Sequence, residues 1–169
     1  MTIRKLSCWF GLFVCFFIFI PFQDVDAGGE TIEGVVKIIL KDNSIVYGDW
    51  IRVLLVREKV TIPETKGLSK LKKLERVDKV ISAHMTFYKN VRDKMSDAEY
   101  IVAATLTRPD GTFKFTEIVP GQYYVVVTFP SMIGGYKVAW QLSVKVHTGE
   151  TTHIELSNEN FSLPTYHRD

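Results

Sequence analysis

The second half of the chain alternates apolar and polar positions. The clearest run is Tyr136–Val146, in which almost every second residue is a large apolar or aromatic one. Such a period of two is typical of a β-strand with one buried face. We expect one set of side chains to face a core: Tyr136, Val138, Trp140, Leu142, Val144 and Val146. The set between them is expected to face solvent: Lys137, Ala139, Gln141, Ser143 and Lys145.

Six further segments have the residue pattern of strands. They are 31–40, 45–60, 100–107, a short run around Phe113 and Phe115, 123–129 and 151–156. Both alternating faces of 45–60 are largely apolar, with Trp50 and Leu54 on one face and Ile51 and Val53 on the other, which predicts a central strand. Turn signals separate the segments, among them Asp110-Gly111 and Pro120-Gly121. Seven strands in this arrangement predict an all-β sandwich.

Between residues 61 and 99 the apolar spacing changes from two to three and four. This spacing predicts a helix over about 69–96. The apolar stripe consists of Leu68, Leu71, Leu74, Val77, Ile81, Met85, Tyr88, Val91 and Met95. Ser69 is a candidate N-cap, and a break in the helix is expected near Ser82–His84. We expect the helix to bury this stripe either on the sandwich or on a partner.

The first 27 residues have the organisation of a secretory signal peptide. A positively charged start precedes an apolar run over 6–20, and small residues follow at a cleavage position within 25–27. We therefore expect export and cleavage after Ala27. The apolar run is shorter than the roughly 20 residues that span a bilayer, and a retained membrane anchor is the alternative. Both cysteines, Cys8 and Cys15, lie in this segment, so the mature chain carries none.

Length and charge narrow the class of protein. The chain has 169 residues and a formal net charge of +2, and removal of the signal peptide leaves about 142 residues. That length suits a single domain that buries a real core. A charge so close to neutral excludes the strongly basic surface typical of nucleic-acid-binding proteins. Because the mature chain lacks cysteine, its core and hydrogen bonds must hold the fold without disulfides.

Three short motifs punctuate the strand pattern: Gly-Val-Val at 34–36, Asp-Gly-Thr-Phe-Lys-Phe at 110–115 and Pro-Gly-Gln-Tyr at 120–123. Together with Gly149 before the last strand, they resemble the carboxypeptidase regulatory-like domain family, which has a transthyretin-like (prealbumin-like) fold. The resemblance implies a seven-stranded antiparallel Greek-key β-sandwich over 28–157 that catalyses nothing itself. It also implies inward rings at Phe113, Phe115 and Tyr123. The helical insertion at about 61–99 departs from the family, and 158–169 is expected to be a loose C-terminal tail.

An enzyme is the alternative, because iron-dependent intradiol dioxygenases contain a similar pair of motifs. Their iron is held by two tyrosines and two histidines, one histidine pair being His-x-His. Tyr123 matches one tyrosine, but Glu155 stands where the second histidine of that pair would be. No two of the four histidines have metal-ligand spacing; they are His84, His147, His153 and His167.

A hydrolase of purine breakdown with the same fold class is a second enzyme relative. It ends in Tyr-Arg-Gly-Ser, which the Tyr-His-Arg-Asp of 166–169 does not match. The sequence also lacks a recognisable nucleophile motif. We therefore assign no catalytic, cofactor-binding or metal-binding residue and expect no cofactor.

Two features are candidates for binding. Trp50 and Trp140 are candidates for a sugar-stacking platform, although Trp140 lies on an expected inward face. The basic positions of the helix are a candidate surface for anionic lipid or polysaccharide, although such charges are more often solvated; they are Lys70, Lys72, Lys73, Arg76 and Lys79. We predict a secreted or periplasmic, non-catalytic module with a binding or structural role in a bacterial cell envelope. The expected partner is an envelope protein or a glycan, and the binding residues stay unassigned.

Overall fold

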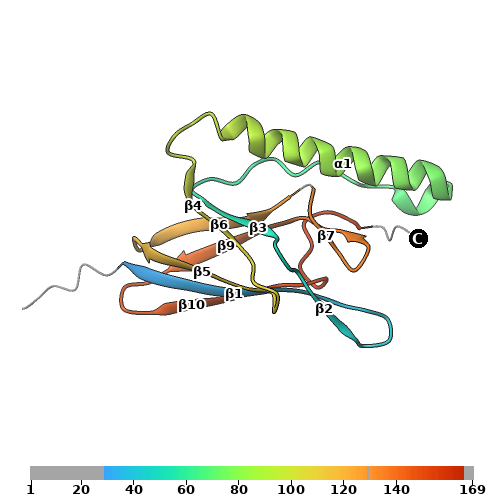
Figure 1. Cartoon of the computed structure of the whole chain (residues 1–169). Coiled ribbons are helices and arrows are strands. Elements are labelled where there is room, and N and C mark those ends of the chain that lie inside the picture. The colour runs from blue at the N-terminus through green and yellow to red at the C-terminus, as the bar shows by residue number, and fades with distance from the viewer. Residues whose placement is uncertain (1–28, 129, 166–169) are drawn as a thin grey trace, which may run out of the picture.

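Two four-stranded β-sheets and one long helix form three layers (Figure 1), and a third sheet consists of two short strands. The computed structural model describes residues 29–128 and 130–165. The predicted signal peptide and the last four residues lie outside these ranges. The strands are β1 Glu30–Ile39, β2 Ile45–Tyr47, β3 Arg52–Val56, β4 Ile101–Leu106, β5 Thr112–Ile118, β6 Gly121–Val127, β7 Met132–Ile133, β8 Tyr136–Lys137, β9 Trp140–Val146 and β10 Thr151–Leu156. The helices are a 3-10 turn, Leu68–Lys70, and α1, Lys73–Lys94.

The first sheet is built around β1. Its neighbour on one side is β10, which runs parallel to it; β5 and β2 pair with it in the antiparallel direction. Val36 joins the last two, because its N–H donates to the Gly111 carbonyl at 2.9 Å and its carbonyl accepts from the Gly48 N–H at 2.9 Å. The expectation of a wholly antiparallel sandwich is therefore wrong at β1–β10. The turn at Thr148-Gly149 carries the chain from β9 to the other sheet, so β10 does not fold back against its predecessor.

The second sheet has the order β4-β3-β6-β9, and each of its pairs is antiparallel. The predicted central strand is confirmed for β3, whose residues Val53 and Leu55 face the first sheet while Leu54 and Val56 face the helix. The segment 45–60 is not one strand, however. It divides into β2 of the first sheet and β3 of the second, with a turn at Asp49-Trp50 between them.

Two turns connect β5, a strand of the first sheet, to β4 and β6 of the second sheet, which precede and follow it along the chain. In the first turn Gly111 has φ +76° and donates its N–H to the Arg108 carbonyl at 2.8 Å. The Asp110 carboxylate accepts hydrogen bonds from the N–H and the hydroxyl of Thr112. The Asp-Gly turn does not close a hairpin, because β4 pairs with β3 while β5 pairs with β1. Pro120-Gly121 then returns the chain to β6 of the second sheet, so β5 joins the two layers at both of its ends.

The core between the sheets contains the predicted inward rings. Phe113, Phe115 and Tyr123 are each at most 4% exposed, and the two phenylalanine rings meet edge to face at 5.7 Å. The Tyr123 hydroxyl donates to the Val119 carbonyl at 2.7 Å, as expected for a tyrosine at the edge of a core. Trp140 is fully buried, and its indole N–H donates to the Ser157 carbonyl at 2.9 Å. Both aromatic donors therefore keep a partner inside the fold.

The helix covers the outer face of the second sheet, which confirms the expectation that it packs on the sandwich (Figure 1). It is continuous through 82–84, and it begins at Lys73 instead of Ser69, with the Lys72 N–H bonded to the Glu75 carboxylate. The predicted stripe is confirmed at Val91 but wrong at Leu74, Met85 and Met95, which are 78%, 45% and 41% exposed. The buried side consists of Val80, Ala83, His84, Phe87 and Val91. A count of large apolar residues misses this face because a small residue and a histidine form part of it. No helix within the described ranges is long and apolar enough to cross a membrane.

The described part of the predicted tail, 158–165, is packed against the domain and is not loose. Leu163 is 2% exposed, and the Ser162 N–H donates to the Ala139 carbonyl at 3.0 Å. The Phe161 ring lies 5.0 Å from that of Trp140. Lys137 was expected in solvent but is 6% exposed. Its strand, β8, ends at this residue, and the segment after β10 lies over it, where the Thr165 hydroxyl donates to the Lys137 carbonyl. The domain therefore extends at least to Thr165.

Candidate functional site

A groove opens between the second half of α1 and one end of the second sheet. Its volume is about 610 Å³. Leu54 and Val126 of the sheet and Val91 of the helix form the floor, and all three are buried. The rim carries large apolar side chains that are exposed to solvent: Trp50 at 71%, Leu106 at 45%, Met95 at 41% and Met132 at 40%. An exposed group of this kind around a cavity is typical of a binding surface. We call it the Trp50 groove.

The backbone forces Trp50 outward. The chain before Trp50 is held to the first sheet, where the Gly48 N–H donates to the Val36 carbonyl. The chain after it is held to the second sheet, where the Ile51 N–H donates to the Thr107 hydroxyl at 2.8 Å. The chain between these anchors turns sharply, and Trp50 adopts φ +55°. This left-handed region costs a bulky residue about 1–2 kcal/mol and is normally left to glycine or asparagine. A strained tryptophan that is mostly in solvent adds little to the core, which singles it out as a functional candidate.

The charges that line the Trp50 groove are positive. Arg52 projects from β3 and Arg92 from α1, and no carboxylate lines this cavity in the described part of the chain. The Arg92 guanidinium carbon lies 5.8 Å from the centre of the Tyr88 ring, a cation–π distance. Its contact with the Asp93 carboxylate is long, at 3.7 Å, and both side chains are more than 45% exposed. Such a surface contact holds the guanidinium weakly, so it can meet an anionic ligand.

One unsatisfied polar atom also lines this groove. The hydroxyl oxygen of Thr128 is buried and has no hydrogen-bond partner among the described residues. The hydroxyl of Ser131 is already used, since it donates to the Thr128 carbonyl at 2.8 Å. A buried hydroxyl without a partner is unfavourable, and a ligand group that reaches it would remove that cost.

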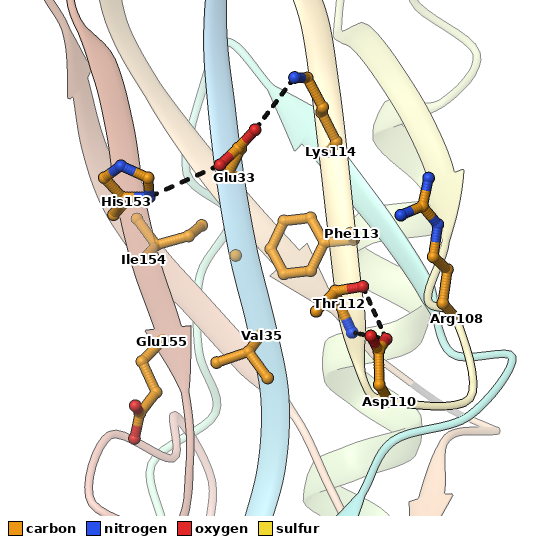
Figure 2. Close-up of a pocket in the computed structure, with 11 residues that line it drawn as sticks. Glu33, Val35, Arg108, Asp110, Thr112, Phe113, Lys114, His153, Ile154 and Glu155 are labelled. Atoms are coloured by element: carbon orange, nitrogen blue, oxygen red, sulfur yellow. Dashed lines mark hydrogen bonds and ion pairs between the residues drawn. The ribbon is translucent and has the colours of Figure 1, made fainter.

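A second groove, of about 630 Å³, lies on the outer face of the first sheet. Figure 2 shows Glu33 of β1 between Lys114 of β5, at 3.0 Å, and His153 of β10, at 3.9 Å. The hydrogen bond from Lys114 lowers the pKa of Glu33. Lys37 and Glu155 pair at 2.8 Å on the same face, and that bond raises the pKa of Lys37. These charges satisfy one another on an open sheet face, so we place the candidate site at the Trp50 groove.

The residues considered for an iron site do not come together. The Tyr123 hydroxyl is bonded to backbone inside the sandwich, while His153 and Glu155 point outward from β10 (Figure 2). His84 is buried beneath the helix, where its ring Nε2–H donates to the Pro164 carbonyl at 2.9 Å and burial lowers its pKa. His147 is exposed, and His167 lies outside the described residues. Within residues 29–128 and 130–165 no three potential metal ligands cluster.

The two tryptophans do not form a platform. Trp140 is fully buried in the core, whereas Trp50 stands in solvent at the groove. The basic helix positions are all exposed and lie outside the Trp50 groove. Sequence reasoning missed the partners of Trp50, because Tyr88, Leu106 and Met132 come from three separate elements. Only the tryptophan itself gave a signal.

Comparisons with known proteins give no family for this chain: no family model and no curated protein matches it. Among solved structures, it is similar to a candidate carbohydrate-binding protein from Pseudomonas aeruginosa, with 13% identity and a TM-score of 0.43 over 78% of this chain and 89% of that one. It is similar to a minor pilin from Streptococcus agalactiae, with 10% identity and a TM-score of 0.44 over 84% of this chain and 48% of the pilin. It is also similar to a major pilin from Bacillus cereus, with 12% identity and a TM-score of 0.39 over 79% of this chain and 30% of the pilin. The chain thus spans less than half of either pilin, and likenesses at this level assign neither family nor function.

Proposed function

We propose that the chain is an exported, non-catalytic β-sandwich module that binds a protein or a glycan of the cell envelope through the Trp50 groove. One observation carries the proposal: a strained, 71% exposed tryptophan stands over a groove that has an apolar floor and a cationic rim. Strain kept at an exposed aromatic residue is better explained by ligand binding than by stability.

Export is supported by the sequence of residues 1–27, with its charged start, apolar run and Ala27. N-terminal sequencing of the protein recovered from outside the cytoplasm tests this part. A start at Gly28 is expected. A retained Met1 would favour the membrane-anchored alternative.

The fold supports the resemblance to carboxypeptidase regulatory-like domains. Seven of the strands in the described part have five or more residues, and they pair as β5-β1-β10 and β4-β3-β6-β9. We take these as the seven strands of a prealbumin-like sandwich, with β2, β7 and β8 as short additions. The function still rests on the groove, because a fold of this kind accommodates many functions.

The binding proposal is tested with point variants rather than by deletion of the insertion. Removing 61–99 would uncover Leu54, Val56 and Val126, so the sheet would lose its cover together with any ligand. We compare the unmodified protein, Trp50→Gly and the control Leu74→Ala in capture of components from an envelope extract of the producing cells. Leu74 is an exposed apolar residue in the first turn of α1, at the opposite end of the helix from the residues that line the Trp50 groove. A component held by the unmodified protein and Leu74→Ala but lost by Trp50→Gly is expected; equal retention by all three contradicts the proposal.

A further inference from the structure

We infer that the occupant of the Trp50 groove is a segment of polypeptide in which a large apolar side chain is flanked by acidic residues. This inference rests on the proposed function and specifies its ligand. The apolar side chain would lie on the floor formed by Leu54, Val91 and Val126. The flanking carboxylates would meet Arg52 and Arg92 at the rim.

The positive charges at the rim indicate that the ligand carries negative charge. Two guanidinium groups line the cavity without a lining carboxylate among the described residues. Arg52 has no ion pair there, and the contact of Arg92 with Asp93 is long and exposed. Guanidinium groups bind carboxylates in a planar, two-point geometry, so an acidic side chain fits both positions.

The apolar part of the lining indicates that the part of the ligand inside the groove is a large apolar side chain. Two methionines stand on the rim, Met95 from the end of the helix and Met132 from β7, and each is about 40% exposed. Methionine side chains adapt to irregular apolar partners and occur at surfaces that bind peptides. Together with Trp50 and Leu106 they surround an opening suited to one large aliphatic or aromatic side chain.

A glycan fits the same lining less well. Sugar hydroxyls need acceptors and donors in pairs, and among the described residues no carboxylate or side-chain amide lines the cavity. Ser131 is engaged with the Thr128 carbonyl, which leaves the Thr128 hydroxyl as the buried polar atom without a partner. Trp50 alone can stack on a sugar ring, but a single stacking face does not supply specificity for hydroxyl groups.

A strand edge lies beside the opening. Leu106 is the last residue of β4, which is an edge strand of the second sheet, and Ile101–Leu106 contains no charged residue. Edge strands in natural proteins are usually guarded by charge or proline. The pairing of β4 with β3 is irregular only near Ile101, so Ala103–Leu106 keeps a regular edge. An extended polypeptide that reaches the groove can use this edge, whereas a glycan cannot.

The test is a binding titration followed by fluorescence anisotropy. The protein is expressed as the full chain and purified as its host processes it. The first probe is a labelled short peptide in which one leucine is flanked on both sides by glutamates. The second probe has lysine in place of each glutamate, and the third is an oligogalacturonate, an anionic glycan. We expect the glutamate peptide to bind, the lysine peptide to bind at least about tenfold more weakly, and added salt to reduce binding.

Variants separate the ligand class from the groove. Reversing both rim charges, with Arg52→Glu and Arg92→Glu, is expected to invert the preference toward the lysine peptide, while Arg76→Glu on the exposed part of α1 leaves it unchanged. If the oligogalacturonate binds in a Trp50-dependent manner and the glutamate peptide does not, the polypeptide inference is overturned and the proposed function stands. If no probe binds and the envelope experiment yields no Trp50-dependent component, both are overturned. Equal binding of the two peptides also contradicts the inference, because charge would then not select the ligand.

Discussion

Glycine at position 50 is expected to stabilise the protein more than alanine does, which reverses their usual order. Trp50 has φ +55° and is 71% exposed. In Trp50→Ala the left-handed backbone remains, and its cost of about 1–2 kcal/mol stays in the folded state. In Trp50→Gly that cost disappears, while the greater freedom of the unfolded chain takes back about 0.5–1 kcal/mol.

The magnitudes decide the comparison. Both variants lose the same partial burial: a tryptophan that is about three tenths covered buries on the order of 45–75 Å², or about 1–2 kcal/mol. This loss cancels when the two variants are compared with each other. The net difference is about 0.5–1 kcal/mol in favour of glycine, and Trp50→Gly itself should lie within about 2 kcal/mol of the unmodified protein.

The assay is urea denaturation followed by far-UV circular dichroism, with the denaturant slopes compared to confirm that both variants unfold alike. Tyr47 is the matched control, since it is an exposed aromatic residue of β2 outside the left-handed region. There alanine should exceed glycine in stability by about 0.5–1 kcal/mol. If Trp50→Ala is as stable as Trp50→Gly or more stable, the left-handed backbone at position 50 does not cost the folded state free energy. A loss above about 3 kcal/mol in Trp50→Gly would show that the tryptophan is part of the core.

Three further predictions concern packing and pH. Burial, with Lys137 nearby, lowers the pKa of His84 below 6.5 in the folded state. As pH drops below about 6.5, the unfolded state takes up a proton first, so the free energy of unfolding should fall. Denaturation midpoints should show this decline, and His84→Gln should flatten it. Leu163→Ala should cost about 2–5 kcal/mol in thermal or urea unfolding, whereas a loose tail would give no change. Gly34→Ala should cost about 1–3 kcal/mol, because the added methyl meets the Phe113 ring, and Phe113→Leu should lessen that cost in the double variant.

The sequence predicted those parts of the fold in which a single element shows its own pattern. The alternation of β3 is apolar on both faces, and the strand is indeed covered on both sides. The inward rings of Phe113 and Tyr123 were expected from the family resemblance, and Phe113 and Phe115 also alternate with the polar Lys114 and Thr116. Such local patterns survive folding because a period of two directs alternate side chains to opposite faces.

Other features depend on neighbours that are remote in sequence. Nothing in Thr151–Leu156 indicates that its partner is a parallel β1, since direction follows from where the preceding turn delivers the chain. Lys137 was expected in solvent and is covered by the segment that ends at Thr165. The buried face of α1 includes His84, whose bond to the Pro164 carbonyl makes burial tolerable, and hydropathy does not register such a bond.

The candidate site was predictable only through Trp50, and only as one of two alternatives. The sequence predicted one continuous strand over 45–60, so the turn at Asp49-Trp50, which directs the indole outward, was not expected. Arg92 and Met132 reach the groove from the helix and from a two-residue strand, and no spacing in the sequence connects them. A site assembled from short contributions of separate elements becomes visible only in three dimensions.

If the Trp50 groove binds a component of the cell envelope, site-specific photo-crosslinking in the producing cells should trap that component at the groove. A photoreactive amino acid is placed at position 50, and in parallel at position 74 on the exposed side of α1. Discrete, reproducible adducts are expected from position 50 and none of these from position 74. Identical adducts from the two positions, or no adduct from position 50, would contradict binding at the groove.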